Sequence, residues 1–272
     1  MSNLTETLHR LKAQGNKAMG LFLTSGFPSP QETLPILQAL DAGGADFLEL
    51  GMPFSDPLAE GLPIQRSSAC ALGHGVRMDD TLRIAAAFRA HSTTPLVLMG
   101  YINPILRYGI SNFCHAARSS GVDGLIIPDL PVEEGALLEG CASTAGLDLV
   151  YLMAPNSPDA RVRRIDARSS GFVYAVSVTG ITGSGLEHRM QAVERYLERA
   201  RMLVRRNPIM VGFGIKTRAD AERLCRHADG FVVGSALVGL IEGLWSDESL
   251  SATARLKAVQ DYARALSLGS GT

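Results

Sequence analysis

The sequence predicts a single-domain α/β protein in which eight parallel strands alternate with helices and close into a (β/α)8 barrel. Short apolar runs of strand length recur eight times, and longer amphipathic segments separate them. The chain has 272 residues, close to the roughly 250 residues typical of such a barrel. Neither a linker nor a change in composition divides it, so we expect residues 1–272 to form one domain.

The eight predicted strands are nearly continuous in apolar residues, as expected where helices cover both faces of a parallel sheet. Their predicted ranges are Met19–Thr24, Asp46–Gly51, Pro95–Gly100, Gly124–Pro128, Leu147–Met153, Phe172–Val178, Pro208–Phe213 and Gly230–Gly234. An open doubly wound sheet is the alternative, but it usually carries a GxGxxG turn after its first strand. Residues Ser25–Pro28 stand there instead, which favours the barrel.

Helix signals lie between the strands. Ser29, Pro30 and Glu32 predict a helix start, with a capping serine, proline at the first helical position and an acid at the third. Residues 190–204 place apolar side chains three and four positions apart, which is typical of an amphipathic helix.

A short repeat occurs where a predicted helix ends and a strand begins. It reads Gly-x-Asp at Gly44–Asp46, Gly121–Asp123 and Gly146–Asp148. Glycine suits a left-handed helix stop at these places.

Composition narrows the class of protein. Hydrophobic residues make up 46% of the chain and charged residues 19%, which allows a large core. No apolar run approaches the roughly 18 residues of a membrane span, and residues 1–14 lack the apolar core of a secretory signal. The net charge of −1 gives no general attraction to nucleic acid or an acidic membrane. We therefore expect a cytoplasmic protein with neither as a partner.

The cysteines and histidines predict no metal site. The six histidines are scattered, without an HxxxH or HxH pair. All the cysteines fall in predicted helices with no metal-binding spacing, and we expect them to be reduced thiols: Cys70, Cys114, Cys141 and Cys225.

The loops after strands seven and eight predict a phosphate site, which makes this a phosphate-binding type of (β/α)8, or TIM, barrel. Strand seven leads into Gly212–Ile215, and strand eight into Gly234 and Ser235, followed by a short predicted helix at Leu237–Leu244. Glycine lets the backbone approach an anion, and the N–H groups of a helix start point toward it. A second helix is predicted at Thr253–Leu266.

Three further features are candidates for function. Ser177–Gly185 is a polar, glycine-rich loop of the kind that forms a mobile lid or a simple connection. Glu49 lies within an apolar strand, where an acid is costly to bury. If Phe47 points outward to the helices, so does Glu49, unless Glu49 belongs to an inward layer near the top of the strand. A structural ion pair is the alternative to catalysis. Glu60 by itself resembles an ordinary loop acid.

The most specific motif follows Glu49. It is Pro53-Phe54-Ser55-Asp56-Pro57, continued by Leu58-Ala59 and Gln65. Further matching segments are Tyr101 with Asn103-Pro104, Pro128–Glu134, Ala154–Asn156, Gly180–Gly183, Gly212–Ile215 and Gly234-Ser235. As an ordered set from about Leu8 to Leu266, these segments resemble the α-subunit family of tryptophan synthase.

That resemblance implies cleavage of indole-3-glycerol phosphate to indole and glyceraldehyde 3-phosphate in L-tryptophan biosynthesis. The reaction is a retro-aldol carbon–carbon scission without a cofactor in this chain. It also implies a β subunit that binds pyridoxal phosphate, receives the indole and completes an α2β2 heterotetramer.

The resemblance assigns roles to residues by position. Glu49 is implied as the acid–base group, Glu60 as the acid that holds the indole N–H, and Tyr174 as the residue that positions Glu49. Thr182 of the lid is implied to bond to Asp56 on closure. Walls of the indole pocket are implied at Phe22, Met99, Ile126 and Phe213, and phosphate contacts at Gly183, Gly214, Gly234 and Ser235.

One departure from the family pattern concerns the second acid. After the shared motif the family usually reads Asp-Gly-Pro-x-Ile-Gln, whereas this chain reads Glu60-Gly61-Leu62-Pro63-Ile64-Gln65. The acid is one methylene longer and the proline has moved by one place, which leaves open a catalytically weak subunit that mainly binds and activates its β partner. A different phosphate-binding barrel, such as an isomerase or epimerase, is a separate alternative, and the motif at residues 53–57 counts against it.

Overall fold

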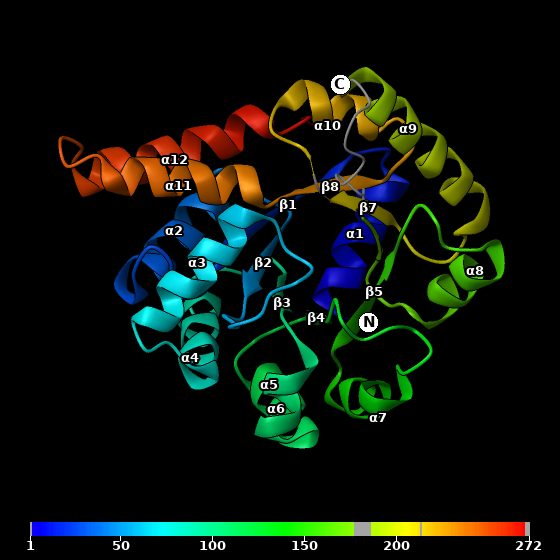
Figure 1. The fold of residues 1–272 in the computed structure, drawn as a ribbon, viewed down its shortest axis with the longest axis horizontal. Helices are drawn as coiled ribbons and strands as arrows, with labels where there is room; N and C mark the ends of the chain where they lie inside the picture. Colours follow the sequence, from blue (N-terminus) through cyan, green and yellow to red (C-terminus); the bar gives the residue numbers. More distant parts are fainter. Residues whose placement is uncertain (1, 177–185, 213, 270–272) are drawn as a thin grey trace.

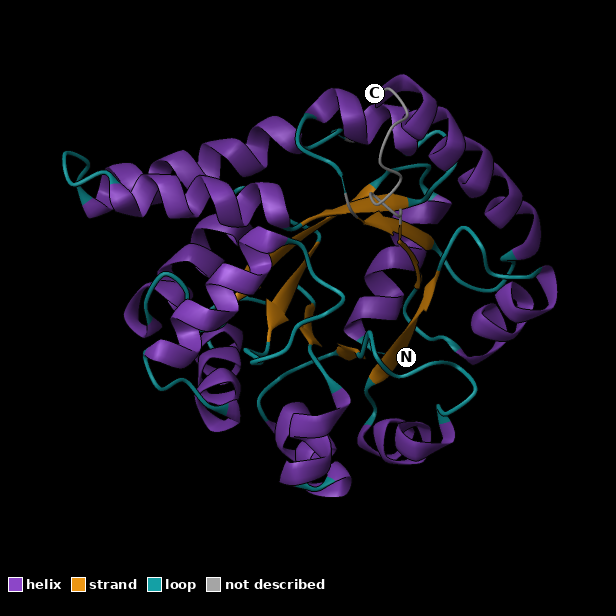
Figure 2. Cartoon of the chain, in the orientation of Figure 1, coloured by secondary structure: helices purple, strands orange, loops and turns teal. Residues whose placement is uncertain are grey.

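Eight parallel strands form a closed barrel in sequence order, β1 to β8. This computed structural model describes residues 2–176, 186–212 and 214–269, and the barrel and its helices are drawn in Figures 1 and 2. The fold predicted from the sequence is confirmed, and the described strand bounds differ from the predicted ones by at most two residues. The strands are β1 Ala18–Thr24, β2 Phe47–Gly51, β3 Leu96–Met99, β4 Gly124–Ile126, β5 Asp148–Met153, β6 Val173–Val176, β7 Ile209–Gly212 and β8 Gly230–Val233.

Helices form an outer layer around the barrel, as Figure 2 shows, except for α1, which lies across the N-terminal end of the barrel (Figure 1). Two of them, α11 and α12, follow the last strand, as predicted. The described helices are α1 Asn3–Ala13, α2 Pro30–Ala42, α3 Leu62–Gly73, α4 Met78–Arg89, α5 Ile102–Tyr108, α6 Ile110–Ser119, α7 Ala136–Ala145, α8 Asp159–Arg168, α9 Leu186–Leu203, α10 Arg218–Leu224, α11 Ser235–Ser246 and α12 Ala252–Leu266. None of the described helices is long and apolar enough to span a membrane.

The start of α2 confirms one part of its prediction and corrects another. Pro30 occupies the first helical position, but the side chain of Ser29 makes no capping hydrogen bond. Thr33, one turn later, makes a different link between the loop and the helix. Its hydroxyl donates to the Ser29 carbonyl over 3.1 Å and accepts the Gly26 N–H over 2.9 Å, so this buried side chain joins the loop to the helix.

The barrel interior pairs large side chains with glycines on neighbouring strands. A Cβ on Gly20 would lie 2.3 Å from the ring of Phe47, and one on Gly212 would lie 2.4 Å from the hydroxyl of Tyr174. The ring of Phe47 also contacts that of Phe172, beside β6 on the opposite side of the closed barrel, with 5.4 Å between ring centroids, so Phe47 points into the barrel. Because side chains alternate along a strand, Glu49 two residues later also points inward, and the outward alternative for both residues is excluded.

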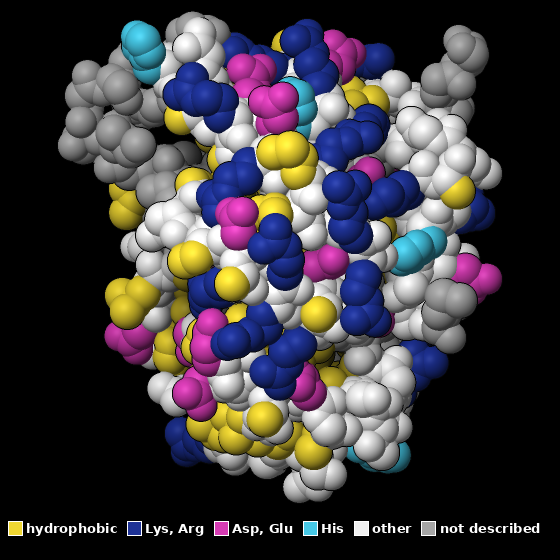
Figure 3. Space-filling view, turned by 90° about the vertical axis from the view of Figure 1, so that its right-hand side faces the viewer, with side chains coloured by type: hydrophobic (Ala, Val, Ile, Leu, Met, Phe, Trp, Pro, Cys, Tyr) yellow, Lys and Arg dark blue, Asp and Glu magenta, His cyan; other side chains and the backbone are white. Residues whose placement is uncertain are grey.

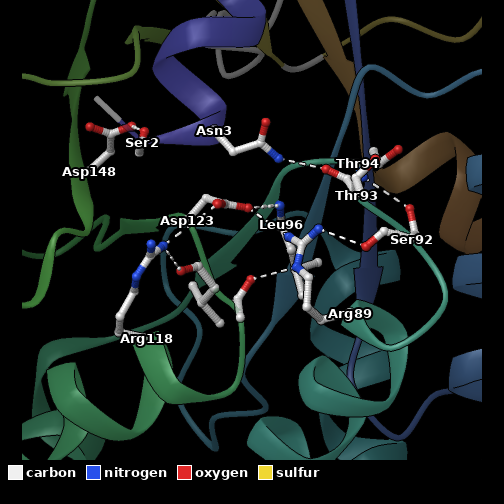
Figure 4. A network of polar contacts seen from close by, with 12 residues as sticks. Ser2, Asn3, Arg89, Ser92, Thr93, Thr94, Leu96, Arg118, Asp123 and Asp148 are labelled. Carbon is white, nitrogen blue, oxygen red and sulfur yellow. Dashed lines mark hydrogen bonds and ion pairs between the residues drawn. The ribbon is translucent and has the colours of Figure 1, made fainter.

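The Gly-x-Asp repeat has a physical role at the N-terminal end of the barrel. All three glycines have positive φ angles, as predicted for helix stops. The aspartates then accept hydrogen bonds from neighbouring elements: Asp46 from the Met19 N–H over 2.8 Å, Asp123 from the Leu96 N–H over 2.9 Å, and Asp148 from the Thr5 hydroxyl over 2.8 Å. Figure 4 shows Asp123 and Asp148 in this network.

The outer face that carries α8 and α9 is rich in arginine. Figure 3 shows cationic side chains spread over it with acids between them. Arg161 pairs with Glu133 over 3.0 Å, and Arg199 pairs with Asp159 over 2.9 Å. These ion pairs make the face one of mixed charge.

All four cysteines are free thiols, and two of them are buried. Three lie in helices as predicted, whereas Cys225 immediately follows the last residue of α10.

Candidate active site

A cavity of about 350 Å³ opens at the carboxyl ends of the barrel strands. Eight of the predicted site residues line it: Phe22, Glu49, Glu60, Met99, Tyr174, Gly214, Gly234 and Ser235. They come from six different strand ends, and the closed barrel is what brings them together. Such a cavity is large enough for a small-molecule substrate.

Glu49 has an unusual environment for an acid. Its side chain is fully buried on β2, and among the described residues neither carboxyl oxygen has a hydrogen-bond partner. Burial, helped by the nearby Glu60 carboxylate, raises the pKa of Glu49 from 4.5 to about 8, because an isolated charge is poorly solvated there. Glu49 therefore carries a proton at neutral pH.

Glu60 reaches the same cavity from the loop between β2 and α3. It is half-buried, and desolvation raises its pKa to about 7. The sequence alone gave no sign of this burial, because the loop could have carried the acid into solvent. At neutral pH its charged and protonated forms have comparable free energies.

Tyr174 on β6 lies close to both acids. Burial first, and then the charges of Glu49 and Glu60, raise its pKa well above the ordinary value. The phenol is therefore neutral. Its ring also contacts Phe172 with 5.8 Å between ring centroids, which limits how it can turn.

Apolar side chains form the walls between the two ends of the cavity. Phe22 and Met99 lie where the sequence places them, whereas Ile126 is fully buried on β4 and is not among the lining residues. Sequence reasoning missed seven lining residues, and three of them are large apolar side chains of these walls: Ile64, Ile215 and Val232. Ile64 could not be found from periodicity alone, because its helix reaches the site only through the path of the preceding loop.

The opposite end of the cavity suits an anion. Gly214, with φ of +83°, follows β7, and Gly234 and Ser235 begin the twelve-residue helix α11. The N–H groups of such a helix start carry partial positive charge. Lys216 also lines this end. It stands two residues after Gly214 in a loop already predicted to bind phosphate, and that position was the available signal for it.

The main chain of Lys216 is held on both sides. Its N–H donates to the Asp220 carboxylate over 3.1 Å, and its carbonyl accepts from the Tyr262 hydroxyl over 3.1 Å. Tyr262 belongs to α12, so the last helix of the chain helps to fix the anion end of the cavity.

Three predicted site residues, Thr182, Gly183 and Phe213, lie outside the described residues. The expected contact between Thr182 and Asp56 falls there too. Among the residues that the structure does describe, no group of three His, Cys, Asp or Glu side chains could hold a metal ion.

A larger hollow, of about 640 Å³, lies at the other end of the barrel. Its charged side chains are engaged in structural contacts: Arg168 pairs with Glu139, and Asp148 accepts from Thr5. Size alone therefore does not identify the site, whereas the buried acids at the carboxyl ends of the strands do.

Comparisons with known proteins agree with this geometry. The family model described as tryptophan synthase alpha chain matches residues 8–267. The tryptophan synthase alpha chain of Chloroflexus aggregans is 44% identical over 262 residues, which cover 94% of this chain and 96% of the relative.

Solved structures show the same similarity. The tryptophan synthase alpha subunit of Legionella pneumophila superposes with a TM-score of 0.88 at 34% identity, covering 98% of this chain and 97% of that one. A chain of the α2β2 complex of tryptophan synthase from Pyrococcus furiosus gives 0.81 at 39% identity, covering 92% and 98%. On this sequence and structural similarity, the chain belongs to the tryptophan synthase alpha chain family.

Proposed function

We propose that this chain cleaves indole-3-glycerol phosphate to indole and glyceraldehyde 3-phosphate, with Glu49 and Glu60 as its catalytic acids. One observation carries the proposal. The two acids of raised pKa and the anion end at Gly234, Ser235 and Lys216 belong to a single cavity with apolar walls. A substrate with a flat apolar ring at one end and a phosphate at the other matches that arrangement.

Glu49 supplies the first proton. Since its pKa of about 8 keeps it protonated at neutral pH, it can donate that proton to C3 of the indole ring and leave the ring as an indolenine cation. The Glu49 carboxylate then accepts the proton of the neighbouring glycerol hydroxyl. The carbon–carbon bond breaks as the aldehyde forms, and its electrons return to the ring. Positioned acid–base groups contribute about 10²–10⁴-fold each.

Glu60 stabilises the cation. Its pKa of about 7 reflects burial, and a positive ring nearby lowers the pKa of a carboxyl group. Formation of the indolenine therefore favours the charged form of Glu60 beside the ring N–H. Tyr174 lines the same cavity as both acids and is neutral, and we assign it the positioning of the Glu49 carboxyl when substrate is bound.

The anion end holds the phosphate. The N–H groups at the start of α11 and the glycines around them supply donors and close approach, and Lys216 supplies a full positive charge. Phosphate binding there places the indole ring of the substrate at the other end of the cavity, beside Glu49 and Glu60. It fixes the reacting carbon atoms without a metal ion.

The partner of the chain is a tryptophan synthase β subunit, in an α2β2 assembly. The rim formed by residues 53–57 and the loops after β3 to β6 is the proposed contact surface. Two apolar side chains stand exposed near this rim, Leu58 at 90% and Leu62 at 69%, and apolar side chains of this kind are typical of a protein interface. Family membership also supports a cytoplasmic location, cofactor-free chemistry in this chain, and pyridoxal phosphate in the β partner.

The test is an assay for indole released from indole-3-glycerol phosphate, with and without the β subunit. We expect slow release by the isolated chain, faster release on mixing, and a large loss in Glu60→Ala. Glu60→Asp alone should lower activity, because the shorter acid no longer reaches the ring N–H. Adding Leu62→Pro and Pro63→Thr to Glu60→Asp should restore part of that loss. A chain that only activates its partner would release equally little indole in all of these variants, and that result would refute the lyase proposal.

A further inference from the structure

Glu60 lies near the end of the loop Met52–Gly61, which joins β2 to α3 and contains neither helix nor strand. The position of a catalytic group matters to about an ångström, since a misplacement of that size can cost roughly 100-fold in rate. Some contact must therefore fix the main chain at residue 60, and two side chains provide such contacts.

Tyr101 provides the first contact. Its hydroxyl oxygen accepts the Ala59 N–H over 3.0 Å. The ring stacks on Phe54, with 4.9 Å between ring centroids and 26° between planes, and only 6% of the residue is exposed. Since Tyr101 lies only two residues after the end of β3, the barrel itself sets where the Ala59 N–H lies.

Gln65 provides the second contact. It lies in the first turns of α3, and its side-chain amide donates to the Glu60 carbonyl over 2.8 Å. The Glu60 N–H is engaged as well, with the Pro57 carbonyl over 3.0 Å. Both main-chain polar groups of Glu60 are therefore bonded, and the preceding residue is bonded to Tyr101.

These contacts leave the carboxylate to the substrate. The bonds from Tyr101 and Gln65 reach main-chain atoms, so they do not compete for the carboxyl oxygens of Glu60. With the main chain held, only the side-chain torsions of Glu60 decide where its carboxyl group lies. A fixed main chain is what allows the longer Glu to serve in this loop, because its reach is then defined.

We propose that Tyr101 and Gln65 are positioning residues for Glu60, acting together as a clamp on the main chain of residues 59 and 60. The proposal rests on the catalytic role of Glu60 given above. It goes further in assigning a kinetic function to two residues that need not touch the reacting atoms. The clamp should affect turnover, because it aligns an acid, and should leave phosphate binding unchanged.

The test removes each clamp bond with little change of shape. Tyr101→Phe keeps the ring on Phe54 and deletes the hydroxyl, and Gln65→Met keeps the length and deletes the amide. The matched control is Tyr108→Phe, which deletes a hydroxyl bonded to Asp79 over 3.0 Å on an exposed part of α5. Each substitution is made in the wild-type chain and in Glu60→Ala, and all are assayed for indole with the β subunit present.

We expect kcat to fall by roughly 10-fold in each clamp variant, with KM unchanged, and the control to match the wild type. In the Glu60→Ala background neither clamp substitution should lower kcat further, because the acid being positioned is absent. Wild-type kcat in both clamp variants, or the same loss with and without Glu60, would refute the clamp. An unchanged kcat in Glu60→Ala would instead refute the catalytic role of Glu60. Melting temperatures separate these outcomes from a general loss of fold.

Discussion

The two ends of the barrel bury carboxyl groups in opposite ways. At the N-terminal end, Asp123 accepts the Leu96 N–H over 2.9 Å and pairs with Arg89 over 2.7 Å (Figure 4). At the C-terminal end, Glu49 is fully buried, and no described residue hydrogen bonds to its carboxyl oxygens. One carboxyl group is therefore satisfied by the fold, while the other is available to a substrate.

A raised pKa is common to the Asp123 and Glu49 carboxyl groups, so the pKa does not distinguish them. Their hydrogen-bond and ion-pair partners do. Burial raises the pKa of Asp123 as well, against the opposing effects of the Leu96 N–H and Arg89. Glu49 differs because no described residue hydrogen bonds to its carboxyl group, so no such contact offsets the effect of burial on its pKa. An unsatisfied buried acid costs stability, and such a cost is retained in proteins chiefly at functional sites.

The aspartates of the Gly-x-Asp repeat satisfy polar groups at the N-terminal end of the barrel. Two of the three accept a main-chain N–H at the beginning of the preceding strand: Asp46 that of Met19, the second residue of β1, and Asp123 that of Leu96, the first residue of β3. Asp148 instead accepts from a side chain of α1. Buried main-chain N–H groups at these strand starts would otherwise lack a partner. The repeat belongs to the fold, and no comparable repeat marks the catalytic end.

The largest effect should come from Glu49→Gln. The amide keeps the shape of the side chain but cannot transfer a proton, so indole release should fall by about 10²–10⁴-fold. The thermal melt at neutral pH should stay close to that of the wild type, since a protonated acid is exchanged for a neutral amide of the same shape. Wild-type turnover in this variant would end the assignment of Glu49 as the acid–base group.

Asp123→Ala should give the opposite result at the other end. It leaves Arg89 and the Leu96 N–H without their partner, and removing one member of a buried pair costs about 3 kcal/mol of unfolding free energy. Urea denaturation measures this loss, while kcat per folded molecule should stay at the wild-type value. A fall in kcat without a loss of stability would mean that the two ends are not functionally separate.

The strands could be predicted from sequence because each is a short apolar run with its own local signal. The site depends on loops, and there the sequence was less informative. It placed Glu60 in a loop without showing its burial, and Lys216 and Ile64 become site residues only when the barrel closes. The predicted capping bond of Ser29 is wrong, and the buried Thr33 hydroxyl instead joins the Ser29 carbonyl to the Gly26 N–H of the preceding loop.

The pH dependence of stability offers a third test. The pKa of Glu49 rises from 4.5 to about 8 on folding, so between these values the folded chain keeps a proton that the unfolded chain has lost. The free energy of unfolding should therefore fall as pH rises through this window, by up to about 1.4 kcal/mol per pH unit for this group, and level off above it.

Urea denaturation of the wild type and Glu49→Gln across that window isolates the contribution, because Glu60 titrates in both proteins. The stability of the variant relative to the wild type should increase with pH. A constant difference would mean that Glu49 has a charge partner in the folded chain, and the contrast between the two ends would fail.

The smallest effect concerns Lys216, at the anion end of the cavity. If its charge assists phosphate binding, Lys216→Met should raise KM by about 2- to 5-fold, the range expected for an exposed ion pair, and leave kcat unchanged. Salt should raise KM more in the wild type than in the variant, because exposed charges are screened. Lys257→Met is the control, since that exposed lysine pairs with Asp261 on α12 away from the cavity lining.

Because the N–H groups of α11 and the glycines remain in Lys216→Met, binding should be weakened and not lost. A fall in kcat at constant KM would instead assign Lys216 to the acid end of the chemistry, and would show that the polar groups of this cavity are not divided between binding and catalysis as their positions indicate.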